Sequence, residues 1–364
     1  MQDFKPQKIL NTLHAAGYEA YYVGGCVRDT LLGREIHDWD ITTSALPEEV
    51  MMCFPHCIPT GVKHGTVTVC TEECQAEVTT YRTDGRYADG RHPEQVCFVR
   101  SLKEDLARRD FTVNAMAMDV SGALIDLFGG ETDLHAGVLR CVGEPERRFR
   151  EDALRMLRAV RFSAQLGFTI EQGTWEAIGR CAGMCEQLSV ERIRDEIEKT
   201  LMSPHPERIA DMVSFGMLKR FGTELTGDAA WLASLPARRP VRWAGLCRIW
   251  PGVDLQVLRL DKRTACNAME AASFPVPEDR LGWKRLVAEH GSEKVEITAA
   301  LEGQDWAFAE LLLSGECMSL RELAVNGADF PERKGKELGT HLHKLLYHVL
   351  KHPGDNQREI LLNL

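Results

Sequence analysis

The 364-residue sequence lacks any long apolar run. No segment reaches the roughly 18 uncharged apolar residues that a membrane-spanning helix needs. The first ten residues, MQDFKPQKIL, also lack the apolar core of a signal peptide. No membrane partner is therefore expected, and the predicted location is cytoplasmic.

Paired C-x-x-C motifs are also missing, although the sequence contains 12 cysteines. Cys53, His56 and Cys57 in CFPHC could form half of a metal site, but no second half-site follows at a suitable spacing. A metal-sensing protein built on CFPHC is therefore disfavoured. Reduced and mostly buried thiols are the expected state of these cysteines.

Positive charge is not in excess. The formal net charge is −10, from 44 Lys and Arg against 54 Asp and Glu. This balance argues against a protein that coats nucleic acid in general. It remains compatible with a specific RNA partner, because a local basic stripe is sufficient for phosphate contacts.

The period of the hydrophobic pattern changes once along the chain. Residues 20–130 contain β-branched runs between glycine-rich turns, namely GTVTVC (65–70), AEVTTY (76–81), VCFV (96–99) and ALIDLF (123–128). From about Glu146 onward, apolar residues recur about every 3.6 residues throughout. The sequence therefore predicts an α+β fold, with a head of mixed strands and helices followed by a helical remainder.

The stretch YYVGGCVRDTLLGREIHDWDITT (21–43) concentrates glycine, arginine and aspartate. The apolar run before Gly24 and Gly25 predicts a buried strand that enters a tight turn, and residues 27–32 predict a short helix. The N-terminus of a helix favours anions, and Arg28 could add a fork directed at a phosphate. Ordinary turn chemistry is the alternative reading of the glycine pair.

Asp38 and Asp40 flank Trp39 in the same stretch. β-Branched residues follow them, so a strand is predicted, and side chains two residues apart in a strand point to the same face. Two carboxylates on one face suit Mg²⁺, which takes oxygen ligands and keeps positions for substrate phosphates. Beside a phosphate-binding candidate, the pair predicts metal-dependent phosphoryl or nucleotidyl transfer. A solvated edge strand is the alternative.

Three further segments could complete this site. Glu77 is the nearest strand-borne candidate for a third carboxylate, with a charge on a solvated strand face as an equal alternative. Arg109 in RRDFTVNAMAMD (108–119) could bind a triphosphate, or it could complement the C-terminal end of a helix together with Arg108. The segment RTDGRYADGRHPEQ (82–95) is rich in glycine and charge and predicts a mobile surface loop.

A helix is predicted over REDALRMLRAVRF (150–162). Arg155, Arg158 and Arg161 share an arc of about 120° on this helix, opposite an apolar face. The alternative is a solvated helix face carrying ion pairs between residues four apart.

Asp152 and Arg155 stand one turn apart and could read a nucleobase. A carboxylate accepts from an exocyclic amine, and a guanidinium donates to the adjacent ring nitrogen. Cytosine and adenine present this donor and acceptor side by side, whereas uracil and guanine present a carbonyl and an N–H. The pair could therefore accept C and A and refuse U and G, with Glu151 holding Arg155 in place.

These motifs together closely resemble the class II tRNA nucleotidyltransferase and poly(A) polymerase family, in particular its bacterial CCA-adding members. The resemblance rests on GGCVRDTLLG with DWD, on TGVKHGTVTV, on RRDFTVNAMAMD, and on REDALRMLRAVRF with ERIRDEIEK (191–199). A weaker match in LAVNGADF (323–330) extends the similarity over nearly the whole chain.

The resemblance implies a polymerase-β-like nucleotidyltransferase head with a mixed sheet, followed by an all-helical neck, body and tail. The expected bounds are 1–140 for the catalytic head, 141–202 for the neck that selects the nucleotide, 203–272 for the body and 273–364 for a tail that binds tRNA. The implied partners are CTP, ATP and the acceptor stem and 3′ end of tRNA, and no DNA partner is expected.

The resemblance also implies roles by position. Asp38 and Asp40 would hold Mg²⁺, and Glu77 stays the candidate for a third catalytic carboxylate. The nucleotide would be bound by seven residues, which are Gly25, Arg28, Arg109, Asp152, Arg155, Arg158 and Arg161. The tRNA 3′-hydroxyl would attack the α-phosphate and release pyrophosphate, without a nucleic-acid template.

Members of this family differ in what they add. A CC-adding enzyme is disfavoured because the segment 82–95 looks full length, and a poly(A) polymerase because a long basic tail is absent. Intact Asp38 and Asp40 disfavour a catalytically silent RNA-binding relative. An A-adding enzyme shares the neck motif and the loop, so it stays the alternative to full CCA addition.

Overall fold

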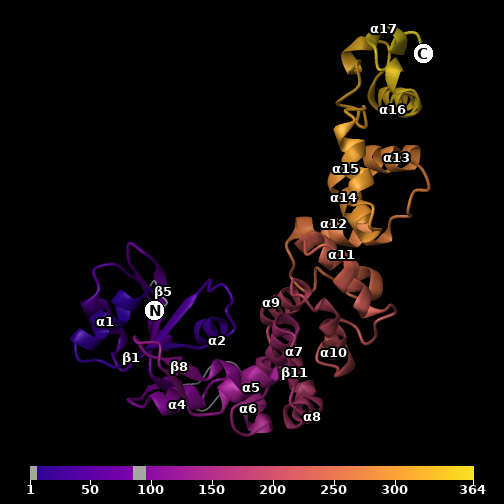
Figure 1. Ribbon diagram of the computed structural model, residues 1–364. Coiled ribbons are helices and arrows are strands. Elements are labelled where there is room, and N and C mark those ends of the chain that lie inside the picture. Colours follow the sequence, from indigo (N-terminus) through magenta and orange to yellow (C-terminus); the bar gives the residue numbers. More distant parts are fainter. Residues whose placement is uncertain (1–5, 85–95) are drawn as a thin grey trace. The chain divides into compact units, whose positions relative to one another are not determined.

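A computed structural model describes residues 6–84 and 96–364. The chain divides into two compact units. The first runs to Thr200 and includes Arg208–Thr223, and the second consists of Leu201–Glu207 and Glu224–Leu364. Figure 1 shows strands gathered in the N-terminal part of the chain and helices along the remainder, which confirms the predicted α+β class. The finer division into head, neck, body and tail stays a prediction.

A mixed sheet forms the N-terminal part. Seven strands of the described residues lie in the order β3-β4-β5-β2-β1-β8-β9. Their bounds are Cys57–Gly61, Thr66–Cys70, Gln75–Thr80, Trp39–Thr43, Ala20–Val23, Met116–Met118 and Leu124–Asp126. β2 and β5 run parallel, whereas the other neighbours are antiparallel. The strands expected at 65–70, 76–81 and 123–128 are confirmed to within a few residues.

One face of this sheet is covered by α4 (Leu102–Ala107). Val23 of β1 packs against Leu106 of α4, with Tyr21 alongside. Because side chains alternate along a strand, the register of β1 with β2 puts Thr42 on this same face, opposite Tyr21. Asp40, two residues before Thr42, therefore also points toward the end of α4.

Helices make up most of the remaining elements of the first unit. In addition to α4, these helices are α1 (Gln7–Ala15), α2 (Gly25–Leu31), α3 (Pro47–Cys53), α5 (Gly130–Ala136), α6 (Pro145–Glu151), α7 (Leu154–Leu166), α8 (Gln172–Cys181), α9 (Val190–Leu201) and α10 (Ile209–Ser214). A short strand, β11 (Thr169–Ile170), lies between α7 and α8 and pairs parallel with β10 (Val138–Leu139). The prediction of a wholly helical chain after Glu146 is therefore wrong at β11.

The helix predicted over 150–162 is interrupted. α6 ends before Asp152, whose backbone is extended at φ −147°, and α7 begins at Leu154. The Asp152 carboxylate accepts a hydrogen bond from the Leu154 backbone N–H at 3.0 Å. Aspartate competes with the helical backbone in this way and so favours the start of a helix over its interior. Asp152 consequently lies at a junction between two helices.

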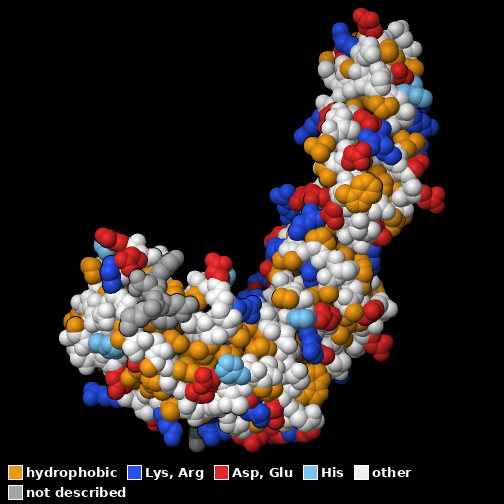
Figure 2. Space-filling view, viewed as in Figure 1, with side chains coloured by type: hydrophobic (Ala, Val, Ile, Leu, Met, Phe, Trp, Pro, Cys, Tyr) orange, Lys and Arg blue, Asp and Glu red, His pale blue; other side chains and the backbone are white. Residues whose placement is uncertain are grey.

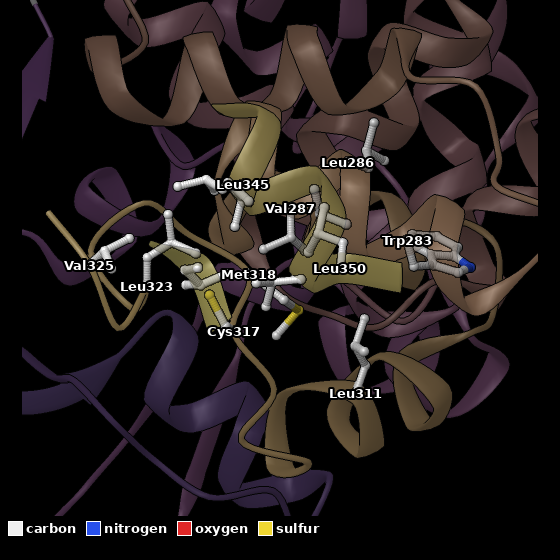
Figure 3. Close-up of a cluster of buried hydrophobic side chains, with 14 of the residues drawn as sticks. Trp283, Leu286, Val287, Leu311, Cys317, Met318, Leu323, Val325, Leu345 and Leu350 are labelled. Carbon is white, nitrogen blue, oxygen red and sulfur yellow. The ribbon is translucent and has the colours of Figure 1, made fainter. Parts of the chain in front are cut away.

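The second unit is helical and has its own core. Its helices are α11 (Arg239–Ile249), α12 (Lys262–Ser273), α13 (Arg280–His290), α14 (Ser292–Leu301), α15 (Asp305–Leu313), α16 (Gly335–Lys351) and α17 (Arg358–Leu361). Figure 3 shows Trp283 and Val287 of α13 in one apolar cluster with Leu345 and Leu350 of α16. This burial of apolar surface stabilises the packing of α13–α17.

The 12 cysteines are all free. Five are buried, five are partly exposed, and Cys97 and Cys266 are exposed. The expectation of unpaired thiols agrees with this, but the expectation that most are buried is wrong, because several lie on the outer faces of strands and helices. Across the described residues, no three His, Cys, Asp or Glu side chains come together in a way that could hold a metal ion, at CFPHC or elsewhere.

The surface carries both signs of charge. Over the described part of the face drawn in Figure 2, Lys and Arg side chains are interspersed with Asp and Glu. In the part of the chain that the structure describes, no helix combines the length and the apolar character needed to cross a bilayer.

The packing of α5 yields a stability test. A Cβ atom on Gly130 would lie 2.3 Å from the Thr112 carbonyl oxygen and 2.8 Å from Cγ of Met116. We expect Gly130→Ala to lower the free energy of unfolding by about 1–3 kcal/mol, because the helix must shift away. In urea unfolding, Gly183→Ala serves as control, since nothing lies within 4 Å of its added Cβ. A Gly130→Ala variant as stable as the control would contradict this packing.

Candidate functional site

Two carboxylates lie side by side on the α4 face of the sheet. Asp40 of β2 and Glu77 of β5 are register partners in the parallel pair of these strands. Asp38 lies in a bend just before β2, so the prediction that both aspartates belong to the strand is wrong for Asp38. Pairing of β2 with β5 begins only at Trp39, and the chain before it is free to bend.

Charge is concentrated around Asp40. Burial raises the pKa of Asp40 to about 6, and the nearby carboxylates of Glu77 and Asp38 add to this rise. The positive charge of Arg109 lowers the pKa but does not cancel the effect of burial. A divalent cation would relieve this repulsion between neighbouring carboxylates. The donor set fits Mg²⁺, which is commonly held by one or two protein carboxylates and completes its shell with water and phosphate oxygens.

A cavity of about 230 Å³ lies over these carboxylates. Asp40 and Glu77 line it together with three arginines, which are Arg82, Arg108 and Arg109. A cation held by the carboxylates and the guanidiniums of the arginines would flank the same space. This arrangement suits a polyphosphate, whose negative oxygens can bind both.

Arg109 keeps donor capacity for an anion. Its Nη2 donates to Oδ2 of Asp105 at 3.3 Å, and its Nε is buried without a hydrogen-bond partner among the described residues. A Cβ atom on Gly24 would lie only 2.9 Å from Nη1 of Arg109, and Gly24 has φ +77°. The backbone conformation therefore favours glycine at position 24, and any larger residue would displace the Arg109 guanidinium, whereas a Cβ on Gly25 would make only ordinary contact with Arg28.

Asp105 holds the two arginines and was not predicted from the sequence. Its side chain has no exposed surface. It accepts hydrogen bonds from Nε of Arg108 at 3.0 Å, Nη2 of Arg109 at 3.3 Å and Oγ1 of Thr42 at 3.2 Å. Burial alone would raise the pKa of Asp105, but the charges of Arg109 and Arg108 hold it below its ordinary value. Asp105 thus stays ionised and ties the end of α4 to β2.

Arg28 is committed within the fold. Its Nε and Nη2 donate to the carboxylate of Asp29 at 3.0 and 2.8 Å, and its Nη1 donates to Oδ1 of Asn114 at 2.6 Å. Nδ2 of Asn114 donates in turn to Asp110 at 3.3 Å, and Asp110 accepts from Nε of Arg158 at 2.7 Å. A phosphate would have to compete with Asp29 for the Arg28 fork, so this predicted contact stays a prediction.

Arg155 connects α7 to the loop that carries Arg109. Its Nη1 donates to Oε2 of Glu151 at 2.9 Å, as expected, and its Nη2 donates to the carbonyl oxygen of Arg108 at 2.9 Å. The carboxylate of Asp152 is bound from α9, by Nη2 of Arg192 at 2.7 Å. The two predicted base-reading residues are therefore near one another in sequence but are oriented by different partners.

Phe162 lies beneath three of the predicted arginines. The Cζ atoms of Arg161, Arg158 and Arg28 lie 3.8, 5.1 and 5.3 Å from the centre of its ring. Cations over an aromatic face are attracted by its quadrupole. Arg161 also donates to Glu196 and is only 6% exposed, so in this structure it supports the wall of the site.

Four residues that the sequence reasoning did not assign hold the predicted ones in place, namely Asp105, Asp110, Arg192 and Glu196. A local signal existed for one of them. Asp105 stands three and four residues before Arg108 and Arg109, which is ion-pair spacing on a helix. Arg192 and Glu196 are likewise four apart, but their partners are distant in sequence. Of the predicted loop 82–95, β6 (Arg82–Asp84) is described, and 85–95 lie outside the described residues.

Comparison with known proteins gives matches to two families. Residues 20–140 match the poly A polymerase head domain, and residues 167–226 match the probable RNA and SrmB-binding site of polymerase A. The CCA-adding enzyme of Lactiplantibacillus plantarum is 57% identical over 98% of this chain and 94% of its own. That of Geobacillus stearothermophilus is 42% identical over 91% of this chain and 87% of its own.

Two solved structures of CCA-adding enzymes are similar in fold to this chain. The crystal structure of the Bacillus stearothermophilus CCA-adding enzyme in complex with CTP has a TM-score of 0.83 at 36% identity, covering 98% of this chain and 94% of that one. The Thermotoga maritima CCA-adding enzyme complexed with tRNA-CCA has a TM-score of 0.61 at 22% identity, covering 98% and 93%, and this second likeness concerns the fold alone.

The buried Asp110 yields a pH test. Burial would raise its pKa, but Arg158 and Asn114 lower it to about 2. A carboxyl whose pKa is lowered by folding stabilises the fold above its ordinary pKa of 3.8, and this contribution is lost as the pH falls through about 2. We expect Asp110→Asn to cost about 2 kcal/mol at pH 7 and to flatten the acid dependence measured by urea unfolding. Asp195→Asn, at an exposed site, is the control, and an unchanged acid slope in Asp110→Asn would refute the assignment.

Proposed function

This chain belongs to the family of tRNA nucleotidyltransferases and poly(A) polymerases, among its CCA-adding members, and on this premise we propose that it adds C, C and then A to the 3′ end of tRNA. The substrates are CTP and ATP, and no nucleic-acid template takes part. The observation that carries the proposal is the cavity where Asp40 and Glu77 face Arg109, whose buried Nε has no partner among the described residues.

Asp38 and Asp40 hold Mg²⁺ in this proposal. When bound there, Mg²⁺ neutralises charge on the phosphate that is attacked and helps to activate the tRNA 3′-hydroxyl. Arg109 binds the triphosphate, supported by Asp105, and Gly24 leaves room for its guanidinium. Glu77, as the register partner of Asp40, serves as the third carboxylate of the site.

The attack itself is a displacement at the α-phosphate. The oxygen of the 3′-hydroxyl forms a new bond to phosphorus, the bond to the β-phosphate breaks, and pyrophosphate leaves. The side chains act mainly by positioning the nucleotide and by binding its negative charge. None of the roles proposed for these residues involves a base edge, so the same chemistry serves CTP and ATP.

Base choice belongs to the residues around α7. Asp152 accepts from the exocyclic amine of cytosine or adenine, and Arg155 donates to the adjacent ring nitrogen. In the present structure Arg155 donates to Glu151 and to Arg108, so reading a base requires it to exchange or share one of these bonds. Arg158 and Arg161, with Gly25 and Arg28, shape the remainder of the nucleotide pocket. A tRNA substrate also agrees with a cytoplasmic location.

The direct test uses three RNAs. tRNAs that end at the discriminator base, at the first C and at the second C are incubated with Mg²⁺ and with CTP, ATP or both. We expect CTP to extend the first two RNAs and ATP to extend only the third. Product from the third RNA alone would establish an A-adding enzyme instead. Absence of product from all three would refute nucleotidyl transfer to tRNA.

A set of variants tests the division of labour. We expect Asp40→Ala to lower the rates of C and of A addition alike, by about 100-fold or more. Asp152→Ala and Arg155→Ala should instead lower the preference for CTP over UTP by about 10-fold while pyrophosphate release continues. Arg150→Ala is the matched control, because this exposed side chain of α6 pairs with Glu146. Unchanged discrimination against UTP in both neck variants would rule out base reading by this pair.

A further inference from the structure

The segment ERIRDEIEK (191–199) makes up most of α9 and has no role in the proposed function so far. Arg192 and Glu196 stand four residues apart on α9 and therefore lie on the same side of the helix. Each is paired with a residue of the predicted nucleotide pocket: Arg192 with Asp152, and Glu196 with Arg161. One turn of α9 thus supplies a cation to a carboxylate of the pocket and a carboxylate to a cation of the pocket.

The bond between Arg192 and Asp152 determines how the carboxylate is oriented. Oδ1 of Asp152 accepts from the Leu154 backbone N–H at 3.0 Å, and Oδ2 accepts from Nη2 of Arg192 at 2.7 Å. Asp152 lies at the junction of α6 and α7, so no helical turn restrains its side chain. Each carboxylate oxygen can accept two hydrogen bonds, and each therefore keeps one acceptor position for an exocyclic amine.

Arg192 has capacity that the described fold does not use. Its Nη1 is buried and has no hydrogen-bond partner among the residues that the structure describes. Buried polar groups of a purely structural ion pair are normally satisfied. The contrast with Arg161 is informative, because that guanidinium donates to both Glu196 and Gln165. Arg192 therefore keeps one buried donor that its bond to Asp152 does not use.

We propose that Arg192 is a positioning residue for base selection, which fixes the Asp152 carboxylate in the orientation that accepts the amine of cytosine or adenine. The inference rests on the proposed function, because it takes Asp152 as a base-reading residue. Arg192 acts on the carboxylate and not on a particular base. Its loss therefore weakens the recognition of C and A together and leaves the chemistry at Asp40 intact.

The test compares Arg192→Met, which keeps an unbranched stem without charge, with Arg192→Lys. Initial rates are measured for CTP and UTP on tRNA ending at the discriminator base, and for ATP and GTP on tRNA ending in CC. For Arg192→Met we expect the preferences for CTP over UTP and for ATP over GTP to fall by about 10-fold each. The loss should occur in KM more than in kcat. Arg192→Lys should restore part of the preference.

Arg194→Met is the matched control, because Arg194 lies on the same helix and pairs with the exposed Asp195. It should keep the preferences of the wild-type protein. Urea unfolding of all variants separates selection from stability. A variant that loses stability but selects nucleotides like the wild type would make Arg192 a structural tie and overturn the proposal.

A double variant tests whether Arg192 acts through Asp152. If it does, Asp152→Ala combined with Arg192→Met should select no worse than Asp152→Ala alone. A further, additive loss of selection would overturn the proposal.

The possible failures are distinguishable. If the wild-type protein adds neither C nor A, the proposed function and this inference both fail. If it adds both and Asp152→Ala selects normally, the base-reading pair is wrong, and this inference falls with it. If Asp152→Ala loses selection and Arg192→Met keeps it, only the role of Arg192 is overturned.

Discussion

The buried carboxylate of Asp105 is the constraint on which the candidate site depends. Arginines that face a cavity repel one another, and a cation taken from water needs a close partner. Asp105 has no exposed surface and contacts both Arg108 and Arg109 while bonding to Thr42 of the sheet. The arginines are thereby held over Asp40 and Glu77, and Nε of Arg109 has no partner among the described residues.

The same short segment serves both halves of the site. Arg109 faces the cavity over the sheet, the carbonyl of Arg108 accepts from Arg155, and Asp110 accepts from Arg158. Three consecutive residues therefore reach both the cavity over the sheet and the side chains of α7. A shift of residues 108–110 would move the groups proposed for triphosphate binding together with those proposed for base choice. The segment therefore couples the positions of the two groups.

Buried ion pairs of this kind are costly to assemble, and here they occur in a connected set. Asp29, Arg28, Asn114, Asp110 and Arg158 form an unbroken series of hydrogen bonds, and Phe162 lies beneath its two arginines. Removing one partner would leave a buried charge uncompensated, which is more damaging than replacing the pair. The network thus specifies geometry more than it supplies stability. Such a network keeps the charged side chains in fixed positions, as the binding of a highly charged nucleotide requires.

The sequence by itself determined the α+β class, the main strands, the glycine turn before α2, the carboxylates of the sheet and the family. These follow from local signals, which are the spacing of apolar residues, the glycine pair at 24 and 25, and short motifs in a fixed order. Tertiary structure alone decided which carboxylate each arginine binds, that Asp152 ends a helix rather than lying on one, and that Arg192 reaches it. With 44 Lys and Arg and 54 Asp and Glu, many pairings are compatible with the sequence. The pairs that form join residues such as Asp152 and Arg192, which only folding brings together. The attraction between charges depends on their distance in space, so it produces no regular pattern along the sequence.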